Sequence, residues 1–222
     1  IHLSSTNSSL IKNNSAYNNS QYGVYLGSSN NNTITGNLVH NNTQYGVYLA
    51  TSSNNSISNN SAYGNSQSGI YLSSSSNSNI LSNNLAYSNA IAGIYLSSSS
   101  ANTIFNNSLY SNSQHGAFIS TSSSNTIANN TAYSNQYGVY LASSSNNTLT
   151  SNSVHNNTNT GIYFSTSSNN TLTSNSAYGN TWYGIYFSSS SNNILTSNSV
   201  YNHTQHGIFL GTSSNNILTS NS

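Results

Sequence analysis

The sequence has no aspartate, glutamate, cysteine, proline or methionine, and Lys12 is its single lysine or arginine among 222 residues. Globular proteins carry roughly 25% charged residues. One lysine cannot form the basic stripe that nucleic acid binding requires, nor the basic helix that lies on an anionic membrane. No segment approaches the ~18 consecutive apolar residues of a membrane span. We therefore expect no nucleic acid partner and no membrane insertion.

The missing acids also limit catalysis. Glycoside hydrolysis uses a pair of carboxylates, and a nucleophilic serine needs a histidine that an acid orients. The chain contains no acidic side chain for either arrangement. We therefore predict that it is not an enzyme and has no catalytic residue.

Two further absences concern location. The absence of cysteine is compatible with any compartment. The single lysine leaves trypsin-like proteases almost no cleavage site in a chain dominated by Ser, Asn, Thr and Tyr. This composition favours an extracellular or cell-surface location.

The feature that is present throughout is a repeat. A glycine followed by an apolar residue and then by tyrosine or phenylalanine recurs at Gly23, Gly46, Gly69, Gly93, Gly116, Gly138, Gly161, Gly184 and Gly207. Six of the eight intervals are 23 residues, one is 24 and one is 22. Such a fixed period argues against low-complexity disorder and indicates a solenoid or a propeller.

Apolar residues fall at four positions of each repeat, as in Val24, Leu26, Ile34 and Val39. Each is flanked by residues that can face solvent, and this alternation predicts three short strands per repeat. A propeller blade needs about 40 residues and four strands, so stacked rungs fit better. We predict an all-β, right-handed, three-faced parallel β-helix (β-solenoid) of about ten rungs of 23 residues. Residues 1–222 are expected to form one solenoid domain that starts and ends within a rung, and the hand follows from the preference for right-handed crossovers.

Asparagine occupies one position in every rung, which predicts a structural asparagine ladder. Its members are Asn14, Asn37, Asn60, Asn84, Asn107, Asn130, Asn152, Asn175, Asn198 and Asn221. Two further asparagine positions, represented by Asn32 and Asn42, also lie between strand positions. Asparagine tolerates the left-handed conformation, and identical amides can hydrogen-bond from rung to rung. Three asparagine corners imply a triangular cross-section. The extra residue of the 24-residue interval and the missing residue of the 22-residue interval both fall at corners.

All 18 tyrosines fall at only three positions of the repeat, represented by Tyr17, Tyr22 and Tyr25. The full set is Tyr17, Tyr22, Tyr25, Tyr45, Tyr48, Tyr63, Tyr71, Tyr87, Tyr95, Tyr110, Tyr133, Tyr137, Tyr140, Tyr163, Tyr178, Tyr183, Tyr186 and Tyr201. One interpretation is that these rings stack between rungs and support the sheets. The other is that the three columns form a tyrosine strip around one corner, which stacks on sugar rings or packs against another solenoid.

The six histidines do not suggest a metal site. His40 and His155 share the Tyr17 position, and His115 and His206 share the Tyr22 position, so members of each pair lie roughly 19–24 Å apart. His203 and His206 supply two ligands at most, whereas zinc takes three or four. We predict no metal and no cofactor.

Units such as GIYLSSSSNSNILSNN at residues 69–84 resemble the repeats of the parallel β-helix repeat family, within the pectin-lyase-like superfold. That family includes polysaccharide lyases and hydrolases, carbohydrate-binding and sugar-hydrolase type repeats, and repeat-rich microbial surface proteins. The resemblance covers the whole chain and implies the fold. Its enzymes use Asp, Lys, Arg or paired carboxylates on the outer strand faces, where this chain has Ser, Thr, Tyr and Asn.

The function favoured by these observations is structural. We predict a rigid rod of a cell-surface layer, sheath or filament, which associates with copies of itself end to end and laterally through the tyrosine strip, since open solenoid ends are templates for strand addition. A carbohydrate-binding, adhesin-like module that takes glycans as partners is the alternative. An ice-binding solenoid is less favoured, because Leu10, Ile80, Ile194 and Ile217 interrupt the row of hydroxyl side chains at the Thr33 position. Thirteen Asn-x-Ser/Thr sequons permit glycosylation without indicating it.

Overall fold

Strands form where an apolar residue stands between two polar ones, because successive side chains of a strand point to opposite faces. The computed structural model describes residues 1–222. Ile34 is fully buried at the centre of β5 (Thr33–Thr35), with both flanking threonines partly exposed. In β4 (Val24–Gly27) two apolar side chains, Val24 and Leu26, face inward. Each rung therefore contributes four inward side chains, as the sequence pattern predicts.

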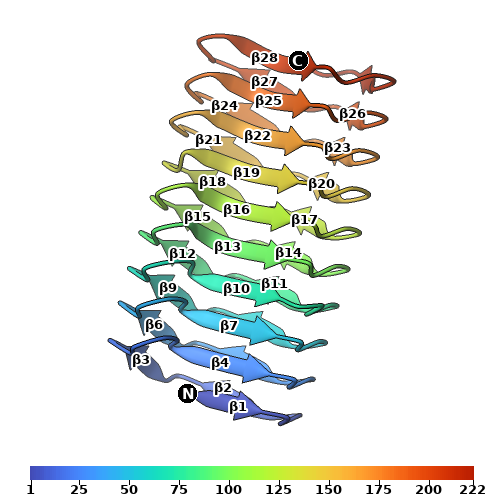
Figure 1. The fold of residues 1–222 in the computed structure, drawn as a ribbon. Helices are drawn as coiled ribbons and strands as arrows, with labels where there is room; N and C mark the ends of the chain where they lie inside the picture. Colours follow the sequence, from blue (N-terminus) through green and yellow to red (C-terminus); the bar gives the residue numbers. More distant parts are fainter.

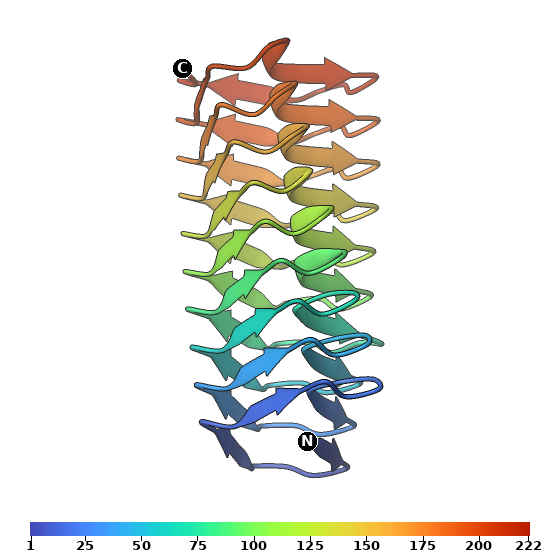
Figure 2. The same cartoon turned by 90° about the vertical axis from the view of Figure 1, so that its left-hand side faces the viewer.

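Three parallel sheets run along the molecule, one on each face (Figures 1 and 2). Sheet A contains β1 (His2–Ser4), β4 (Val24–Gly27), β7 (Val47–Ala50), β10 (Ile70–Ser73), β13 (Ala92–Ser97), β16 (His115–Ser120), β19 (Tyr137–Ala142), β22 (Thr160–Ser165), β25 (Tyr183–Ser188) and β28 (His206–Gly211). Sheet B contains β2 (Leu10–Lys12), β5 (Thr33–Thr35), β8 (Ser56–Ser58), β11 (Ile80–Ser82), β14 (Thr103–Phe105), β17 (Thr126–Ala128), β20 (Thr148–Thr150), β23 (Thr171–Thr173), β26 (Ile194–Thr196) and β29 (Ile217–Thr219). Sheet C contains β3 (Ser15–Tyr17), β6 (Leu38–His40), β9 (Ser61–Tyr63), β12 (Leu85–Tyr87), β15 (Ser108–Tyr110), β18 (Thr131–Tyr133), β21 (Ser153–His155), β24 (Ser176–Tyr178) and β27 (Ser199–Tyr201).

Every strand pairs with its equivalent one rung away, so identical positions stack in columns. Ile34 lies opposite Ile57, and Leu81 lies opposite Ile104. The inward columns of all three sheets merge into one core cluster of 33 buried residues. The predicted all-β parallel solenoid is confirmed. No helix in the structure is long and apolar enough to cross a membrane.

The corners are built from a pair of residues with different roles. Asn107 is 2% exposed and points inward, whereas the preceding Asn106 is exposed and has a φ of 55°. The same pairing holds along the other asparagine ladders, where Asn31 and Asn41 are the left-handed residues. The expectation that the ladder asparagines themselves are left-handed is therefore wrong. The residue before each of them turns the chain, and the ladder side chain follows it into the interior.

The two length changes are absorbed at corners, as predicted. After β10, Ser74 and Ser75 are both left-handed, yet Ile70 still pairs with Ile94. Tyr137 pairs with His115 although only 22 residues separate them. The sheets therefore keep their register past both irregularities.

Candidate functional site

Sheet A carries two adjacent columns of outward rings, which we call the sheet A aromatic face. The first column contains His2, Tyr25, Tyr48, Tyr71, Tyr95, Phe118, Tyr140, Tyr163, Tyr186 and Phe209. The second contains Tyr22, Tyr45, His115, Tyr137, Tyr183 and His206. Rings of the first column stack from rung to rung, with 4.8 Å between the centroids of Tyr140 and Tyr163. The columns also touch each other, since Tyr183 lies 5.0 Å from Tyr186.

Sheet C carries a single, more regular column. Its members are Tyr17, His40, Tyr63, Tyr87, Tyr110, Tyr133, His155, Tyr178 and Tyr201. Neighbouring centroids lie 4.7 to 5.3 Å apart, with interplanar angles of 1° to 12°. Almost parallel rings with this spacing cover one another's faces and leave only their edges in solvent.

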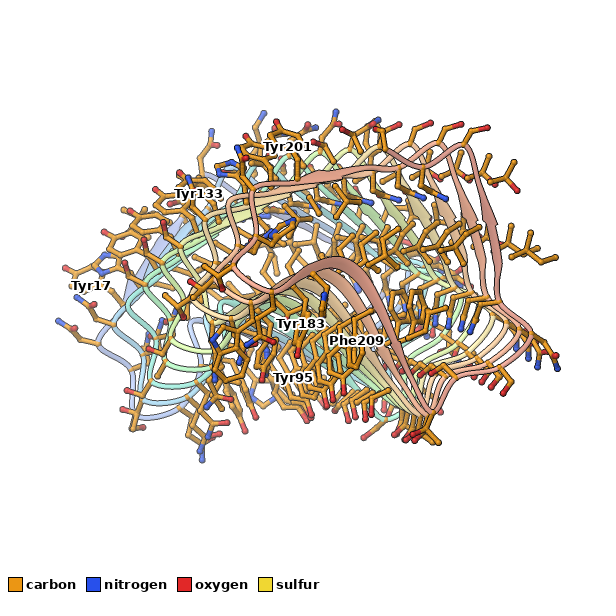
Figure 3. All side chains as sticks on the ribbon, turned by 90° about the horizontal axis from the view of Figure 1, so that it is seen from above. Tyr17, Tyr95, Tyr133, Tyr183, Tyr201 and Phe209 are labelled. Carbon is orange, nitrogen blue, oxygen red and sulfur yellow. The ribbon has the colours of Figure 1, made fainter.

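The structure divides the predicted tyrosine strip into two surfaces. The Tyr22 and Tyr25 columns lie together on sheet A, but no ring of the Tyr17 column contacts either of them. Figure 3 shows Tyr17 and Tyr201 along one side of the molecule and Tyr95 and Phe209 along another. The three columns therefore lie on both sides of the corner between sheets C and A, and they do not form one continuous surface of touching rings. The stacking between rungs is observed on both surfaces.

The asparagine ladder is hydrogen-bonded as predicted. Asn107 Nδ2 donates to the Leu81 carbonyl at 2.8 Å and to Asn130 Oδ1 at 2.9 Å. Its Oδ1 accepts from the backbone N–H and the side-chain Nδ2 of Asn84, at 2.9 and 3.0 Å. These bonds use the amide within the scaffold, which leaves it no capacity for a ligand.

A buried serine ladder in the connection between sheets A and B, three residues before the Asn32 ladder, was not predicted from the sequence. It contains Ser29, Ser52, Ser76, Ser99, Ser122, Ser144, Ser167 and Ser190, all with no exposed surface. Each hydroxyl accepts a backbone N–H from the preceding rung, as in the 2.9 Å bond from Ser29 N to Ser52 Oγ. The repeat of serine at this position was visible in the sequence, but neighbouring serines concealed it.

The histidines occupy positions in the columns and ladders. His115 lies in the second column of sheet A, where burial lowers its pKa to about 4. Burial also lowers the pKa of His155, which stacks between Tyr133 and Tyr178. His203 replaces a ladder asparagine, and its two ring nitrogens lie 3.1 and 3.2 Å from backbone carbonyls. No three of these side chains lie together as a metal site would require.

One break in the second column of sheet A produces a cavity. Thr160 lies between Tyr137 and Tyr183 in register, so a ring is missing from its rung. The space left is a cavity of about 270 Å³, lined by Tyr137, Asn159, Thr160, Tyr163, Trp182, Tyr183, Tyr186 and Gln205. Two rungs separate Tyr137 from Tyr183, which corresponds to about 9.6 Å. The two rings do not face each other across an open gap, because Tyr137 stacks on Tyr163 with 5.6 Å between ring centroids and Thr160 is only 1% exposed. The cavity is walled mainly by tyrosine rings and Trp182.

The other breaks in this column, at Ser68 and Ala92, leave no comparable cavity. Beside Ser68, Tyr45 stacks on Tyr71 with 4.4 Å between the ring centroids, whereas the equivalent stack of Tyr137 on Tyr163 beside Thr160 is looser, at 5.6 Å. Trp182, the single tryptophan, lines the cavity at Thr160 and has 46% of its surface exposed. Neither Thr160 nor Trp182 was among the predicted site residues. The interruption of the Tyr22 position by Thr160 is the signal that could have found this site.

The groups around the cavity are neutral. Asn159 is 9% exposed, donates from Nδ2 to the Tyr137 hydroxyl at 3.2 Å, and accepts at Oδ1 from Thr160 Oγ1 at 3.0 Å. Burial, followed by the neighbouring hydroxyls of Tyr163 and Tyr140, raises the pKa of Tyr137. Its phenol therefore stays protonated at neutral pH.

The chain matches the model of the right handed beta helix region over residues 1–132 and 116–222. It belongs to this family of right-handed β-helix proteins, and the predicted hand and family resemblance are confirmed. No protein of curated function matches the chain in sequence.

Several solved structures share the fold. The periplasmic alginate epimerase AlgG has a TM-score of 0.81 and 19% identity, over 100% of this chain and 70% of that one. The A-module of the mannuronan C-5 epimerase AlgE6 from Azotobacter vinelandii has a TM-score of 0.81 and 21% identity, over 97% of this chain and 65% of that one. The Dettilon tailspike protein has a TM-score of 0.78 and 16% identity, over 97% of this chain and 54% of that one. The chain thus spans 54 to 70% of the length of these neighbours.

These neighbours correct one prediction. We predicted from the missing acids that the chain is not an enzyme, and this inference is wrong, because structures with the same fold include the epimerases AlgG and AlgE6. Carboxylate pairs and serine triads are not the only catalytic groups of proteins. Proton transfer can also be carried out by histidine and tyrosine, and this chain has both.

Proposed function

We propose that the chain is a carbohydrate-binding β-helix, and that the cavity between Tyr137 and Tyr183 holds a sugar ring. The observation that carries this proposal is the missing ring at Thr160. In the sheet C column neighbouring rings are almost parallel, so a sugar meets mostly their edges. At Thr160 the missing ring leaves a cavity walled by Tyr163, Tyr183 and Tyr186, and a pyranose ring stacks on these aromatic walls.

The surroundings of the cavity support a small polar ligand with apolar faces. Its volume of about 270 Å³ lies just below the range of roughly 300–1,000 Å³ that is typical of drug-sized ligands. The amides of Asn159 and Gln205 stand beside the tyrosine rings. Aromatic faces with a few convergent polar groups are the usual composition of a ligand pocket. The names of the neighbours, which include epimerases of alginate and mannuronan, are consistent with polysaccharide as the partner.

The test is a glycan array followed by titration of the bound sugars, using the fluorescence of Trp182. Thr160→Tyr restores the ring that the column lacks, and neighbouring rungs show that tyrosine is accepted at this position. The new ring fills the cavity and removes the stacking contacts of a bound sugar, about 0.5–1.5 kcal/mol each, so we expect affinity to fall roughly tenfold or more. Tyr110→Ser on sheet C is the matched control and should bind normally. Equal binding by Thr160→Tyr and the native chain would exclude the cavity as the sugar site.

A second candidate function is the rod-like structural protein predicted from the sequence, and the sheet C column favours it. That column is flat and has no cavity, and its end members Tyr17 and Tyr201 are 52% and 47% exposed. With no ion pairs to form, lateral association of two rods would rest on apolar burial and hydrogen bonds, which tyrosine supplies together. Sedimentation of the native chain against a Tyr87→Ser, Tyr110→Ser double variant tests this. A native chain that stays monomeric at millimolar concentration would contradict it.

We also propose a location outside the cytoplasm, at the cell surface or beyond it. The supporting neighbours are a periplasmic epimerase and a phage tailspike by name. Surface labelling of the intact source cells with a membrane-impermeant reagent, followed by recovery of the labelled chain, is the direct test.

A further inference from the structure

The cavity at Thr160 contains no charged group, and this property bears on which sugars it accepts. We propose that it selects uncharged sugar rings and excludes uronates. The inference rests on the proposed function, because it names the class of sugar bound at the same cavity.

No cation is near enough to pair with a carboxylate bound there. The polar groups around the cavity are the amides of Asn159 and Gln205, the Thr160 hydroxyl and the tyrosine hydroxyls. Lys12, the single lysine or arginine, lies in β2 of the first rung, whereas Thr160 lies in β22 of the eighth. Seven rungs correspond to about 33 Å, which is roughly four Debye lengths at physiological salt.

His206 is the histidine closest to the cavity along this column, and it is separated from Thr160 by a tyrosine. It pairs in register with Tyr183, with 5.9 Å between ring centroids, on the side away from Thr160. A ring bound over Thr160 therefore meets Tyr183 and not the imidazole.

The hydrogen-bonding groups fit hydroxyls better than a carboxylate. Asn159 Nδ2 donates one N–H to the Tyr137 hydroxyl, and its second N–H has no partner in the protein. A sugar hydroxyl both accepts from such an N–H and donates onward to a phenol or amide oxygen. A carboxylate only accepts, and desolvating it among aromatic rings without a cation is costly. The tyrosine ring faces add to this cost, because they carry the negative side of the ring quadrupole.

The fold that this chain shares with the epimerases therefore does not imply that it binds the same class of sugar. The epimerases AlgG and AlgE6 are named for alginate and mannuronan, which are polymers of uronates. A site for such a polymer needs positive groups along its length, and this chain has none outside its first rung. The cavity is suited instead to neutral hexoses.

The experiment compares oligosaccharides that differ only at C6. A β-1,4-linked mannose hexamer and the mannuronate hexamer of the same linkage form one pair, and the glucose and glucuronate hexamers form a second. Each is titrated into the native chain at pH 8, with Trp182 fluorescence as the readout, because this single tryptophan lines the cavity. We expect at least one neutral hexamer to bind more than tenfold tighter than its uronate counterpart.

Two variants separate the cavity from the remaining surface. Thr160→Tyr should lose both the fluorescence response and the preference for the neutral sugar, whereas Tyr110→Ser should keep both. Equal or tighter binding of the uronates, or a preference that survives in Thr160→Tyr, would overturn the inference and leave carbohydrate binding intact. A native chain that binds no member of either pair, and nothing on the glycan array, would overturn the inference and the proposed function together.

Discussion

At the scale of single residues, each asparagine corner depends on two adjacent residues with different roles. The left-handed Asn106 is exposed and turns the chain. Asn107 then points inward, where its amide bonds to the rungs on both sides. Asparagine suits both positions, because it tolerates a positive φ and because its amide donates and accepts at once. This explains why the sequence so often places two asparagines together.

The first prediction concerns Asn107→Ala. The substitution leaves the Asn84 N–H and the Leu81 carbonyl without their side-chain partner in a buried corner. We expect the free energy of unfolding to fall by roughly 1–3 kcal/mol, measured by urea denaturation. Asn106→Gly is the control, since glycine adopts the same left-handed φ and no buried amide is lost. An Asn107→Ala variant as stable as the control would contradict the structural role of the ladder.

The second prediction is a dependence of stability on pH through His115. Burial lowers the pKa of His115 from 6.5 to about 4. Below pH 6.5 His115 is protonated in the unfolded chain, but in the folded chain it stays neutral down to about pH 4. The contribution of His115 to stability is therefore full above pH 6.5 and is lost as the pH falls from 6.5 to about 4. The loss due to this residue is roughly 3 kcal/mol. No acidic side chain obscures the effect.

The measurement is urea unfolding of the native chain and of His115→Tyr at pH 7 and at pH 4. Tyrosine occurs at the same position one rung on, at Tyr137, so the variant keeps a ring there. We expect it to lose clearly less stability between the two pH values than the native chain. His155, whose pKa burial also lowers, accounts for part of the remaining dependence. Identical losses in both chains would show that His115 is not responsible.

At the scale of strands, most of the fold could be predicted, because alternation of side chains is a local property. A triplet such as Thr33-Ile34-Thr35 has only one way to bury its apolar residue, and the fixed period then aligns the triplets. The candidate site could not be predicted in the same way. The way the corners turn the sheets in three dimensions decides which ring faces are covered. It also decides that Tyr17 lies away from Tyr22. The cavity at Thr160 likewise exists only through its neighbours in adjacent rungs.

The third prediction tests the inward columns through β14. Ile104 is fully buried between Leu81 and Ile127. Ile104→Asp places an unpaired carboxylate in the core, and we expect a loss of at least about 4 kcal/mol or failure to fold. Thr103→Asp, one residue earlier on the outward face, introduces the same charge and should change stability by less than about 1 kcal/mol. A well-folded Ile104→Asp variant with native stability would contradict this placement of the core.

At the scale of the whole molecule, the composition leaves burial and hydrogen bonding as the forces that hold the fold. The structure contains 147 backbone hydrogen bonds, most of which join one rung to the next. Three asparagine ladders and one serine ladder add side-chain bonds between the same rungs. The molecule is therefore a stack in which each rung depends on its two neighbours. Ion pairs between side chains cannot contribute, because there is no acidic side chain to form one.

The last prediction follows from this absence of charge. Salt reduces the Debye length from about 10 Å at 0.1 M to about 3 Å at 1 M, which weakens surface ion pairs in most proteins. Here there are none to weaken, so the free energy of unfolding should change by less than about 0.5 kcal/mol across this range of sodium chloride, by the usual size of surface effects. Sodium sulfate at equal ionic strength should stabilise the chain, because its exclusion from the protein surface strengthens apolar burial independently of charge. Lys12→Gln should behave as the native chain in both salts. A fall in stability with sodium chloride that Lys12→Gln abolishes would show that the lone lysine takes part in an electrostatic contact that burial and hydrogen bonding do not explain.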